Sequence, residues 1–131
     1  MAHYTRFEIY LPLTYTKIEV DPNSGEELSS RCSLDEALVR EFVEEAVKRY
    51  GGLTQVNPLA SPAFKGFWRS NKDRRRIEID FLTYLFGLVR IEDAEKARRF
   101  FEKWKREFEK EENQEVVLVV HYPVQTIGVF L

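Results

Sequence analysis

Residues 74–90 read RRRIEIDFLTYLFGLVR, the longest strand-like stretch of the 131-residue chain. Between Ile77 and Phe81 apolar residues alternate with acidic ones, which is the pattern of a strand with one face in water. From Leu82 to Val89 the residues are uncharged and largely apolar on both faces, which is typical of a strand that is covered on both sides. The stretch therefore predicts a long central strand whose second half is more deeply buried than its first.

Two segments with helical periodicity lie on either side of this strand in the sequence. The first helix is expected over residues 34–50, where Ser33 and Glu36 form a capping box at its start and Gly51 ends it in a left-handed conformation. The second is expected over residues 93–112, with its aromatic residues in one stripe and its charged residues outside that stripe. Both patterns predict helices that pack on a sheet, and the second predicts a solvated charged face.

Shorter patterns predict the strands at the edges of this sheet. A short strand over residues 53–56 is interrupted by two prolines and resumes over residues 64–68. Residues 115–122 form an apolar strand, and Pro123 is expected to break it. The apolar tail over residues 124–131 could pair as another strand.

The N-terminal part begins with residues 4–11, whose alternation predicts a half-buried strand. Residues 14–20 could form a second extended piece, and the run from Asp21 to Gly25 has strong turn chemistry. The sequence leaves open whether residues 13–32 form a hairpin or a loop.

The order of these elements, β-α-β-β-α-β with an apolar C-terminal tail or strand, resembles the ferredoxin-like fold, also called the α/β plait, over most of the chain. The resemblance implies an α+β sandwich with an antiparallel sheet, two helices on one face, and the first and third core strands as central neighbours. Length and an apolar content of 44% predict a single domain spanning residues 1–131.

Composition and hydropathy disfavour membrane, secreted and metal-binding proteins. No uncharged run has the roughly 20 residues that a transmembrane helix needs, and the N-terminus lacks the apolar segment of a secretory signal, so no membrane partner is expected. The single cysteine, Cys32, cannot form an intrachain disulfide, which favours a cytoplasmic protein. The histidines, His3 and His121, lie near strand ends without a ligand pattern, so neither a metal site nor a cofactor is expected.

Residues 64–76 hold the densest concentration of charge. Six basic residues against one acid make a local charge of +5 in a chain of net charge −2, and three aromatic residues are interleaved with them. Such a stretch can hold phosphates and stack on bases; the alternative is a solvated hairpin whose charges prevent edge aggregation. The candidate nucleic-acid-binding residues are Lys65, Trp68, Arg69, Lys72, Arg74, Arg75 and Arg76.

Three carboxylates, Glu8, Glu78 and Asp80, are expected on the sheet face away from the helices. On neighbouring strands two of them could lie about 5 Å apart, where they could hold a divalent cation or perform acid–base chemistry. Arg6 and Arg76 are expected on the same face, so cross-strand ion pairs are the favoured outcome. No catalytic residue is assigned.

The second half of the long strand leaves an apolar patch on the face that the helices do not cover. Natural domains rarely leave such a patch bare, and the tail, a second subunit or a ligand could cover it. Filling by Ile127 and Phe130 would indicate the tail, whereas a buried polar group converging on the patch would indicate a ligand site. The candidate interface or pocket residues are Tyr10, Leu82, Tyr84, Phe86 and Leu88.

The favoured function is a self-associating protein that binds or regulates by interaction, without catalysis, and the expected partner is a second copy. One alternative is a nucleic-acid-binding protein that uses residues 65–76. The other is a small enzyme or ligand-binding dimer with a pocket walled by Tyr10, Tyr84 and Phe86. The sequence identifies no substrate or small-molecule ligand.

Overall fold

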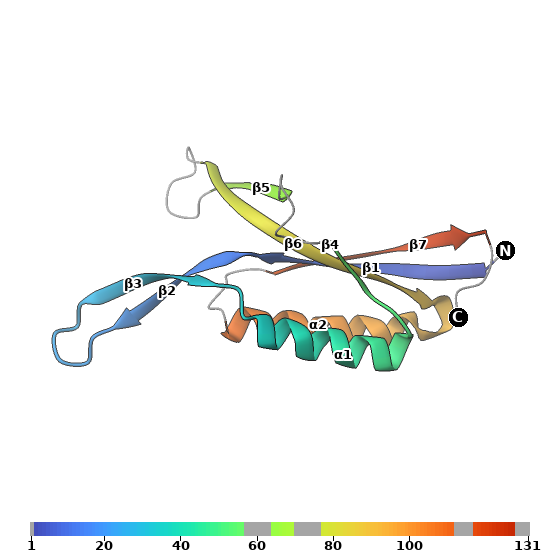
Figure 1. Cartoon of the computed structure of the whole chain (residues 1–131), viewed down its shortest axis with the longest axis horizontal. Coiled ribbons are helices and arrows are strands. Elements are labelled where there is room, and N and C mark those ends of the chain that lie inside the picture. Colours follow the sequence, from blue (N-terminus) through green and yellow to red (C-terminus); the bar gives the residue numbers. More distant parts are fainter. Residues whose placement is uncertain (1, 57–63, 70–76, 112–116, 128–131) are drawn as a thin grey trace.

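The computed structural model describes residues 2–56, 64–69, 77–111 and 117–127 (Figure 1). Within these residues the chain forms seven strands, two α-helices and a short 3₁₀ turn. In chain order the elements are β1 (Ala2–Pro12), β2 (Thr14–Val20), β3 (Glu27–Ser33), α1 (Glu36–Tyr50), β4 (Thr54–Val56), β5 (Phe64–Arg69), β6 (Ile77–Arg90), the turn Ile91–Asp93, α2 (Ala94–Glu111) and β7 (Leu118–Thr126).

The main sheet has the strand order β4-β6-β1-β7, and β5 also pairs with β6. Each of these pairs is antiparallel, and β1 lies beside β6 from Tyr4 opposite Arg90 to Pro12 opposite Leu82. The prediction that the first and third core strands are antiparallel neighbours is confirmed, and the chain is an α+β protein. β4 and β5 pair with different parts of β6, so the strand predicted with a proline-rich interruption is present in two pieces.

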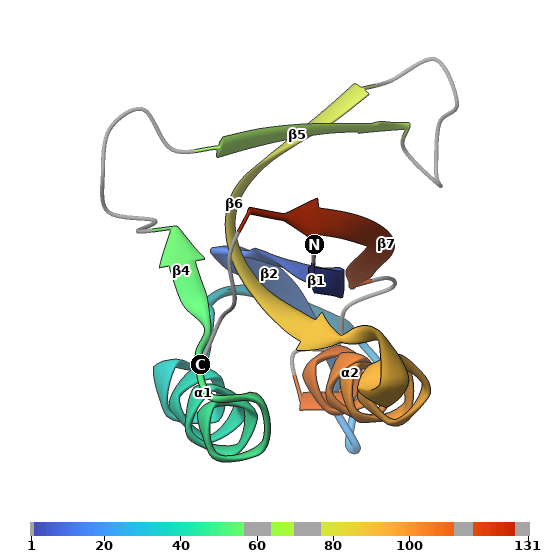
Figure 2. The same ribbon diagram turned by 90° about the vertical axis from the view of Figure 1, so that its right-hand side faces the viewer.

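Both helices lie on one face of the sheet (Figure 2). Phe7 of β1, at the centre of the core, stacks on Phe101 of α2 with 4.7 Å between ring centroids. Phe42 of α1 meets the rings of Trp104 and Phe108 edge to face. Burying side chains of this size contributes about 1.5–3 kcal/mol each, so aromatic packing between the helices and the sheet accounts for much of the stability of the fold.

The ends of α1 confirm one prediction and correct another. Gly51 follows the helix in the left-handed region (φ 86°) and its N–H donates to Val47, as predicted. The N-cap, however, is Asp35, whose carboxylate accepts hydrogen bonds from the backbone N–H groups of Ala37 and Leu38. Ser33 belongs to β3, opposite Thr14, so its strand pairing removes it from the capping position and the predicted capping box is absent.

Pro123 does not break the last strand. β7 continues through it to Thr126, with Pro123 opposite Thr5 of β1. In the described part of the chain β7 pairs only with β1, and proline is tolerated on an edge strand because its missing N–H can face away from the sheet. Residues 124–126 of the predicted tail are therefore part of this edge strand.

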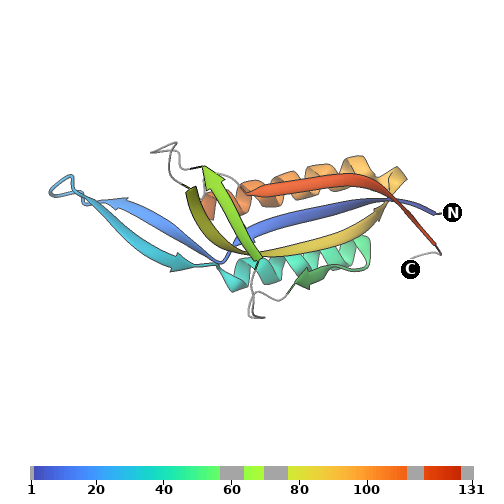
Figure 3. The ribbon, with the colours of Figure 1, turned by 90° about the horizontal axis from the view of Figure 1, so that it is seen from above.

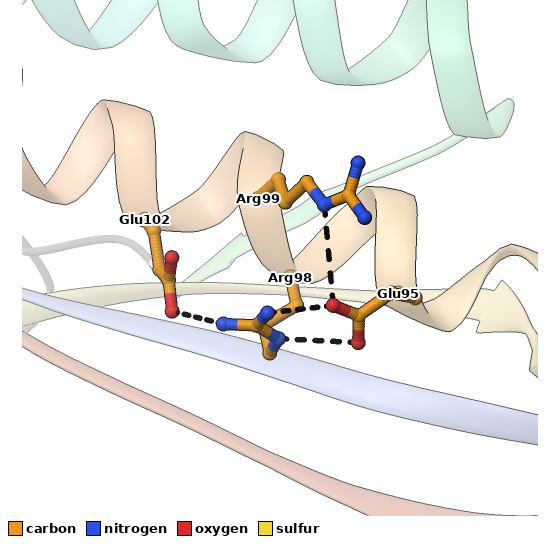
Figure 4. A network of polar contacts seen from close by, with 4 residues as sticks. All are labelled: Glu95, Arg98, Arg99 and Glu102. Carbon is orange, nitrogen blue, oxygen red and sulfur yellow. Dashed lines mark hydrogen bonds and ion pairs between the residues drawn. The ribbon is translucent and has the colours of Figure 1, made fainter.

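The exposed side of α2 carries a network of ion pairs (Figure 4). Arg98 pairs with Glu95 at 2.6 Å and with Glu102, and Arg99 lies 3.9 Å from Glu95. These partners are three or four residues apart, the spacing that brings side chains together on a helix surface. The predicted solvated face of this helix is confirmed, and no helix in the described residues is both long and apolar enough to cross a membrane.

Residues 14–33 form a hairpin and not a loop. β2 and β3 pair antiparallel as a separate two-stranded sheet, from Thr14 opposite Ser33 to Val20 opposite Glu27. The hairpin projects away from the helices and the main sheet (Figures 1 and 3). We call residues 14–33 the arm.

Candidate functional site

A carboxylate occupies the centre of the open face, by which we mean the sheet face opposite the two helices. Glu8 lies in β1 between Phe86 of β6 and Val120 of β7, and it is only 7% exposed. Burying a charged carboxylate costs free energy unless its oxygens accept hydrogen bonds. Its hydrogen-bond partners therefore determine whether this position is stable.

Three donors converge on Glu8, and we call Arg6, Glu8, Tyr10 and Tyr122 the Glu8 cluster. Oε2 of Glu8 accepts a hydrogen bond from Nε of Arg6 at 2.7 Å and another from the hydroxyl of Tyr122 at 2.8 Å. Oε1 accepts the hydroxyl of Tyr10 at 2.8 Å. Strand alternation places Arg6 and Tyr10 on the same face as Glu8, whereas Tyr122 arrives from β7, opposite Arg6.

These contacts determine the ionisation of the Glu8 cluster. Burial by itself would raise the pKa of Glu8, but the hydrogen bonds from Tyr10, Tyr122 and Arg6 lower that pKa below its ordinary value. Burial, together with the bond to Glu8, raises the pKa of Tyr10 to about 12. The bond to Glu8, together with burial, raises the pKa of Tyr122. Near neutral pH the cluster is therefore an ion pair that two protonated phenols complete.

Aromatic rings of β6 lie against this cluster. The guanidinium carbon of Arg6 is 3.8 Å from the ring centroid of Phe86, a cation–π contact. Tyr84 stacks on Tyr10 with centroids 5.2 Å apart and lies 6.0 Å from Phe86. The three rings expected to wall a pocket, those of Tyr10, Tyr84 and Phe86, thus pack on one another or on Arg6.

The five candidate interface residues lie together on the open face. Tyr10 is opposite Tyr84, and the neighbouring register places Leu82, Phe86 and Leu88 on the same side of β6. Leu82 is buried and the other four are half-buried. β7 adds two side chains with more exposure, Leu118 at 41% and Tyr122 at 39%. We call Tyr84, Phe86, Leu88, Leu118 and Tyr122 the open-face patch.

The sequence pattern did not identify the contribution of β7. Leu118 and Tyr122 stand opposite Tyr10 and Arg6, but their own strand is apolar at most positions and gives no alternation that assigns them to a face. Their placement follows from the register of β7 on β1, which joins residues more than 100 positions apart. The signal for Arg6 and Glu8 was present in the alternation of the first strand.

The basic run is divided between described and undescribed residues. Lys65, Trp68 and Arg69 belong to β5, which pairs with β6 from Phe64 opposite Leu82 to Arg69 opposite Ile77. The remaining candidates lie outside the described residues; they are Lys72, Arg74, Arg75 and Arg76. On this ladder the rings of Phe67 and Phe81 are 64% and 51% exposed. Figure 2 shows β5 on the side of β1 and β7 opposite the helices.

The alternative in which Glu8 lies about 5 Å from Glu78 or Asp80 is wrong. Glu78 and Asp80 stand opposite Trp68 and Gly66 of β5, in the half of β6 that β1 does not reach. Asp80 lies six positions before Phe86, the partner of Glu8, which corresponds to about 20 Å of strand. The ion pair of Glu8 also forms within β1, with Arg6, and not across strands.

The histidines and the cysteine do not form a common site. His121 stacks on Phe7 at 5.3 Å, while His3 is opposite Gln125. Cys32 lies in β3, with its sulfur 3.9 Å from the hydroxyl of Ser30. Among the residues that the structure describes, no group of three or more His, Cys, Asp or Glu side chains is arranged to hold a metal ion.

No family model matches the sequence of the chain, and no curated protein matches it at a significant level.

Proposed function

We propose that this chain is a non-catalytic binding protein that self-associates through the open face of its sheet. The observation that carries the proposal is the exposure of Leu118 (41%) and Tyr122 (39%) on β7, across β1 from half-buried Tyr84, Phe86 and Leu88 on β6. Exposed apolar side chains on both sides of the Glu8 cluster can mark an interaction site. A second copy can cover it by a two-fold contact in which the same patch meets itself.

The ionisation of the Glu8 cluster, at the centre of that surface, favours a structural role over a catalytic one. A catalytic acid or base needs a pKa near the working pH, but the pKa of Glu8 is lowered and the pKa of Tyr10 is raised to about 12. The charge of Arg6 offsets that of Glu8 at 2.7 Å. A neutral, internally hydrogen-bonded centre surrounded by apolar groups can be covered by another protein surface without leaving an unpaired charge.

The C-terminal residues that the structure describes leave this face accessible. Residues 124–126 stay in β7, and Ile127 is fully exposed at 105% of its reference area. Ile127 therefore does not fill the patch, and Phe130 lies outside the described residues. Of the three covers considered for the patch, the tail has no support from the C-terminal residues that the structure describes.

We also propose that the core of the chain is a ferredoxin-like sandwich. The support is the antiparallel pairing of β7 with β1, of β1 with β6 and of β6 with β4, with both helices on one face (Figure 2). Two departures lengthen it: the arm between β1 and α1, and the division of one strand into β4 and β5.

The proposal is tested by the mass of the protein in solution. Size-exclusion chromatography with light scattering is expected to give a dimer for the wild type and a monomer for Leu118→Lys/Tyr122→Lys. Val47→Lys is the matched control, because Val47 is also 41% exposed but lies on α1. A wild-type monomer, or a dimer that survives the double substitution, would contradict self-association through this face.

Ligand binding at the same face is a second candidate, because the Glu8 carboxylate is a buried polar group that converges on the patch. Native mass spectrometry of freshly purified protein would then show a retained small molecule. That molecule should be lost in Glu8→Gln. If the measured mass equals that of the polypeptide alone, under conditions that preserve the dimer, the result would count against this candidate.

One observation supports nucleic-acid binding by the paired strands β5 and β6. Phe67 and Phe81 are exposed, Phe67 lies between Lys65 and Arg69 in the sequence, and Phe81 is opposite Lys65. Fluorescence anisotropy with a single-stranded oligonucleotide would then give a log–log salt slope of about −4 for some five phosphate contacts. Arg74→Ala/Arg76→Ala should flatten the slope, and Phe67→Ala should weaken binding at every salt concentration. Absence of binding at low salt would remove this candidate.

A further inference from the structure

In the described part of the chain, the arm forms a sheet of its own, separate from the main sheet. In the described residues β2 and β3 pair only with each other, and seven residue pairs of about 3.4 Å each make a ribbon of roughly 24 Å. An isolated two-stranded hairpin has marginal stability in water. Because no other described strand pairs with this ribbon, its presence is better explained by a partner than by the stability of the monomer.

The base of the arm is held in a defined direction. The N–H of Leu13 donates to the carbonyl of Phe81 at 2.8 Å, and the N–H of Leu34 donates to the carbonyl of Leu13 at 2.8 Å. These bonds join both strands of the arm to the end of the main sheet. The arm therefore leaves the body as a continuation of β1, as Figure 3 shows.

The tip of the arm is also structured. Asp21 closes the turn, since its carbonyl accepts the N–H of Gly25 at 2.9 Å and its carboxylate accepts the N–H of Asn23 at 2.8 Å. Gly25 has a φ of 72°, a conformation that glycine adopts without strain. The turn thus fixes the backbone at the tip of the arm and the carboxylate of Asp21.

Two features of the tip identify the chemistry of its partner. Residues 20–28 contain three acids, Asp21, Glu26 and Glu27, and no basic residue. Val20 and Leu28 are 61% and 56% exposed. Alternation along the paired strands places these two aliphatic residues on opposite faces of the ribbon, because Val20 is opposite Glu27 while Leu28 is opposite Glu19. A complementary surface would combine basic residues with exposed apolar groups.

β5 of the same chain has this complementary composition. Residues 64–69 contain two basic residues, Lys65 and Arg69, and no acid. Phe67, between them, is 64% exposed, and Phe81 of the paired strand is 51% exposed. Because each copy carries one acidic tip and one basic strand, two copies can satisfy both surfaces at once around a two-fold axis.

We propose that the arm tip of one copy docks on β5 of a second copy, and that the arm tip of the second copy docks on β5 of the first. The inference rests on the proposed self-association and specifies a second contact within that dimer. Opposite charges on the two surfaces set the relative orientation of the copies, while Val20 or Leu28 of the tip contacts Phe67.

The test is a charge swap between two variants. The arm variant is Glu26→Lys/Glu27→Lys, and the strand variant is Lys65→Glu/Arg69→Glu. Each variant alone places like charges at both contacts, and we expect it to dimerise roughly tenfold or more weakly than the wild type. An equimolar mixture has opposite charges at both contacts, so we expect heterodimers of near wild-type affinity. Sedimentation velocity with one variant fluorescently labelled measures both quantities.

A matched variant controls for the change in net charge. Glu41→Lys/Glu44→Lys makes the same substitution at two exposed positions of α1, and it should leave dimerisation unchanged. Circular dichroism verifies that each variant is folded. A mixture that dimerises no better than the separate variants would overturn the inference, as would variants that dimerise like the wild type.

The outcomes also separate this inference from the proposed function. A dimer that Leu118→Lys/Tyr122→Lys dissociates but the charge variants do not would overturn the arm contact alone. A dimer that only the charge variants dissociate would support the arm contact and contradict the open face as an interface. A wild-type monomer would overturn both.

Discussion

Two carboxylate–arginine networks in this protein use the same chemistry in opposite environments. In the Glu8 cluster the Glu8 carboxylate is buried, bonded to Arg6, and completed by two tyrosine hydroxyls. On α2, Glu95 and Arg98 form a similarly short pair, but the side chain of Glu95 is 61% exposed. Water can replace the partners of the exposed pair and cannot readily replace those of the buried one. The contribution of an ion pair to stability therefore depends on its burial as well as on its geometry.

The largest effect is expected from removing the buried carboxylate. Glu8→Ala leaves Arg6 and Tyr10 without their acceptor, and we expect the free energy of unfolding to fall by about 1–3 kcal/mol. Urea denaturation followed by circular dichroism measures the change. Glu102→Ala, in the α2 network, is the exposed counterpart and should change the free energy much less. Equal effects for the two substitutions would contradict the contrast between the networks.

A second effect separates the charge of Glu8 from its shape. The pKa of Glu8 is lowered in the folded protein from an ordinary value of 4.5, so its contribution to stability is present above that value and is lost as the pH falls through the folded pKa. Glu8→Gln should therefore be less stable than the wild type at pH 7 but approach it in acid. Unfolding curves across this range test the convergence, and a constant difference would exclude the carboxylate charge as its cause.

Tyr10 gives a smaller effect with the opposite pH dependence. Its pKa is raised from 10.0 to about 12, so its contribution to stability is complete below pH 10 and is lost as the pH rises toward 12. Tyr10→Phe should lower the free energy of unfolding by about 1 kcal/mol near neutral pH. It should also remove a late component from the tyrosinate absorbance titration at 295 nm. Retention of that component would assign it to another tyrosine.

The smallest effect is expected on α2. Arg98→Ala removes pairs with Glu95 and Glu102, but all three side chains are substantially exposed and salt screens such pairs. The melting temperature should change little at low salt and not measurably at about 1 M salt. Differential scanning calorimetry at the two ionic strengths measures this. A large, salt-independent loss would mean that the α2 network behaves like the buried one.

Local pattern predicted most elements of the fold. Alternation in residues 4–11 places Arg6, Glu8 and Tyr10 on one face, and these residues form three quarters of the Glu8 cluster. The aromatic stripe of residues 93–112 became the helix face that packs on Phe7 and Phe42. These predictions succeeded because strand and helix periodicities depend on residues close in sequence.

Predictions failed where two local signals competed or where pairing decided the outcome. Ser33 and Asp35 are both good caps, and the pairing of Ser33 with Thr14 left the position to Asp35. Pro123 can end a strand, but β7 is an edge strand in the described sheet and accommodates it. Neither result could be read from the neighbouring residues alone.

Local sequence pattern predicted both helices, most of the strands, the residues of the first strand that share a face, and the concentration of charge in residues 64–76. In contrast, the position of Glu8 opposite Phe86 and far from Asp80, and the hydrogen bond that Tyr122 donates to it, follow from strand pairing. This difference arises because the two kinds of feature depend on interactions of different range along the sequence. Periodicity is encoded over a few residues, whereas the register between β1, β6 and β7 depends on how distant segments bury their apolar faces together.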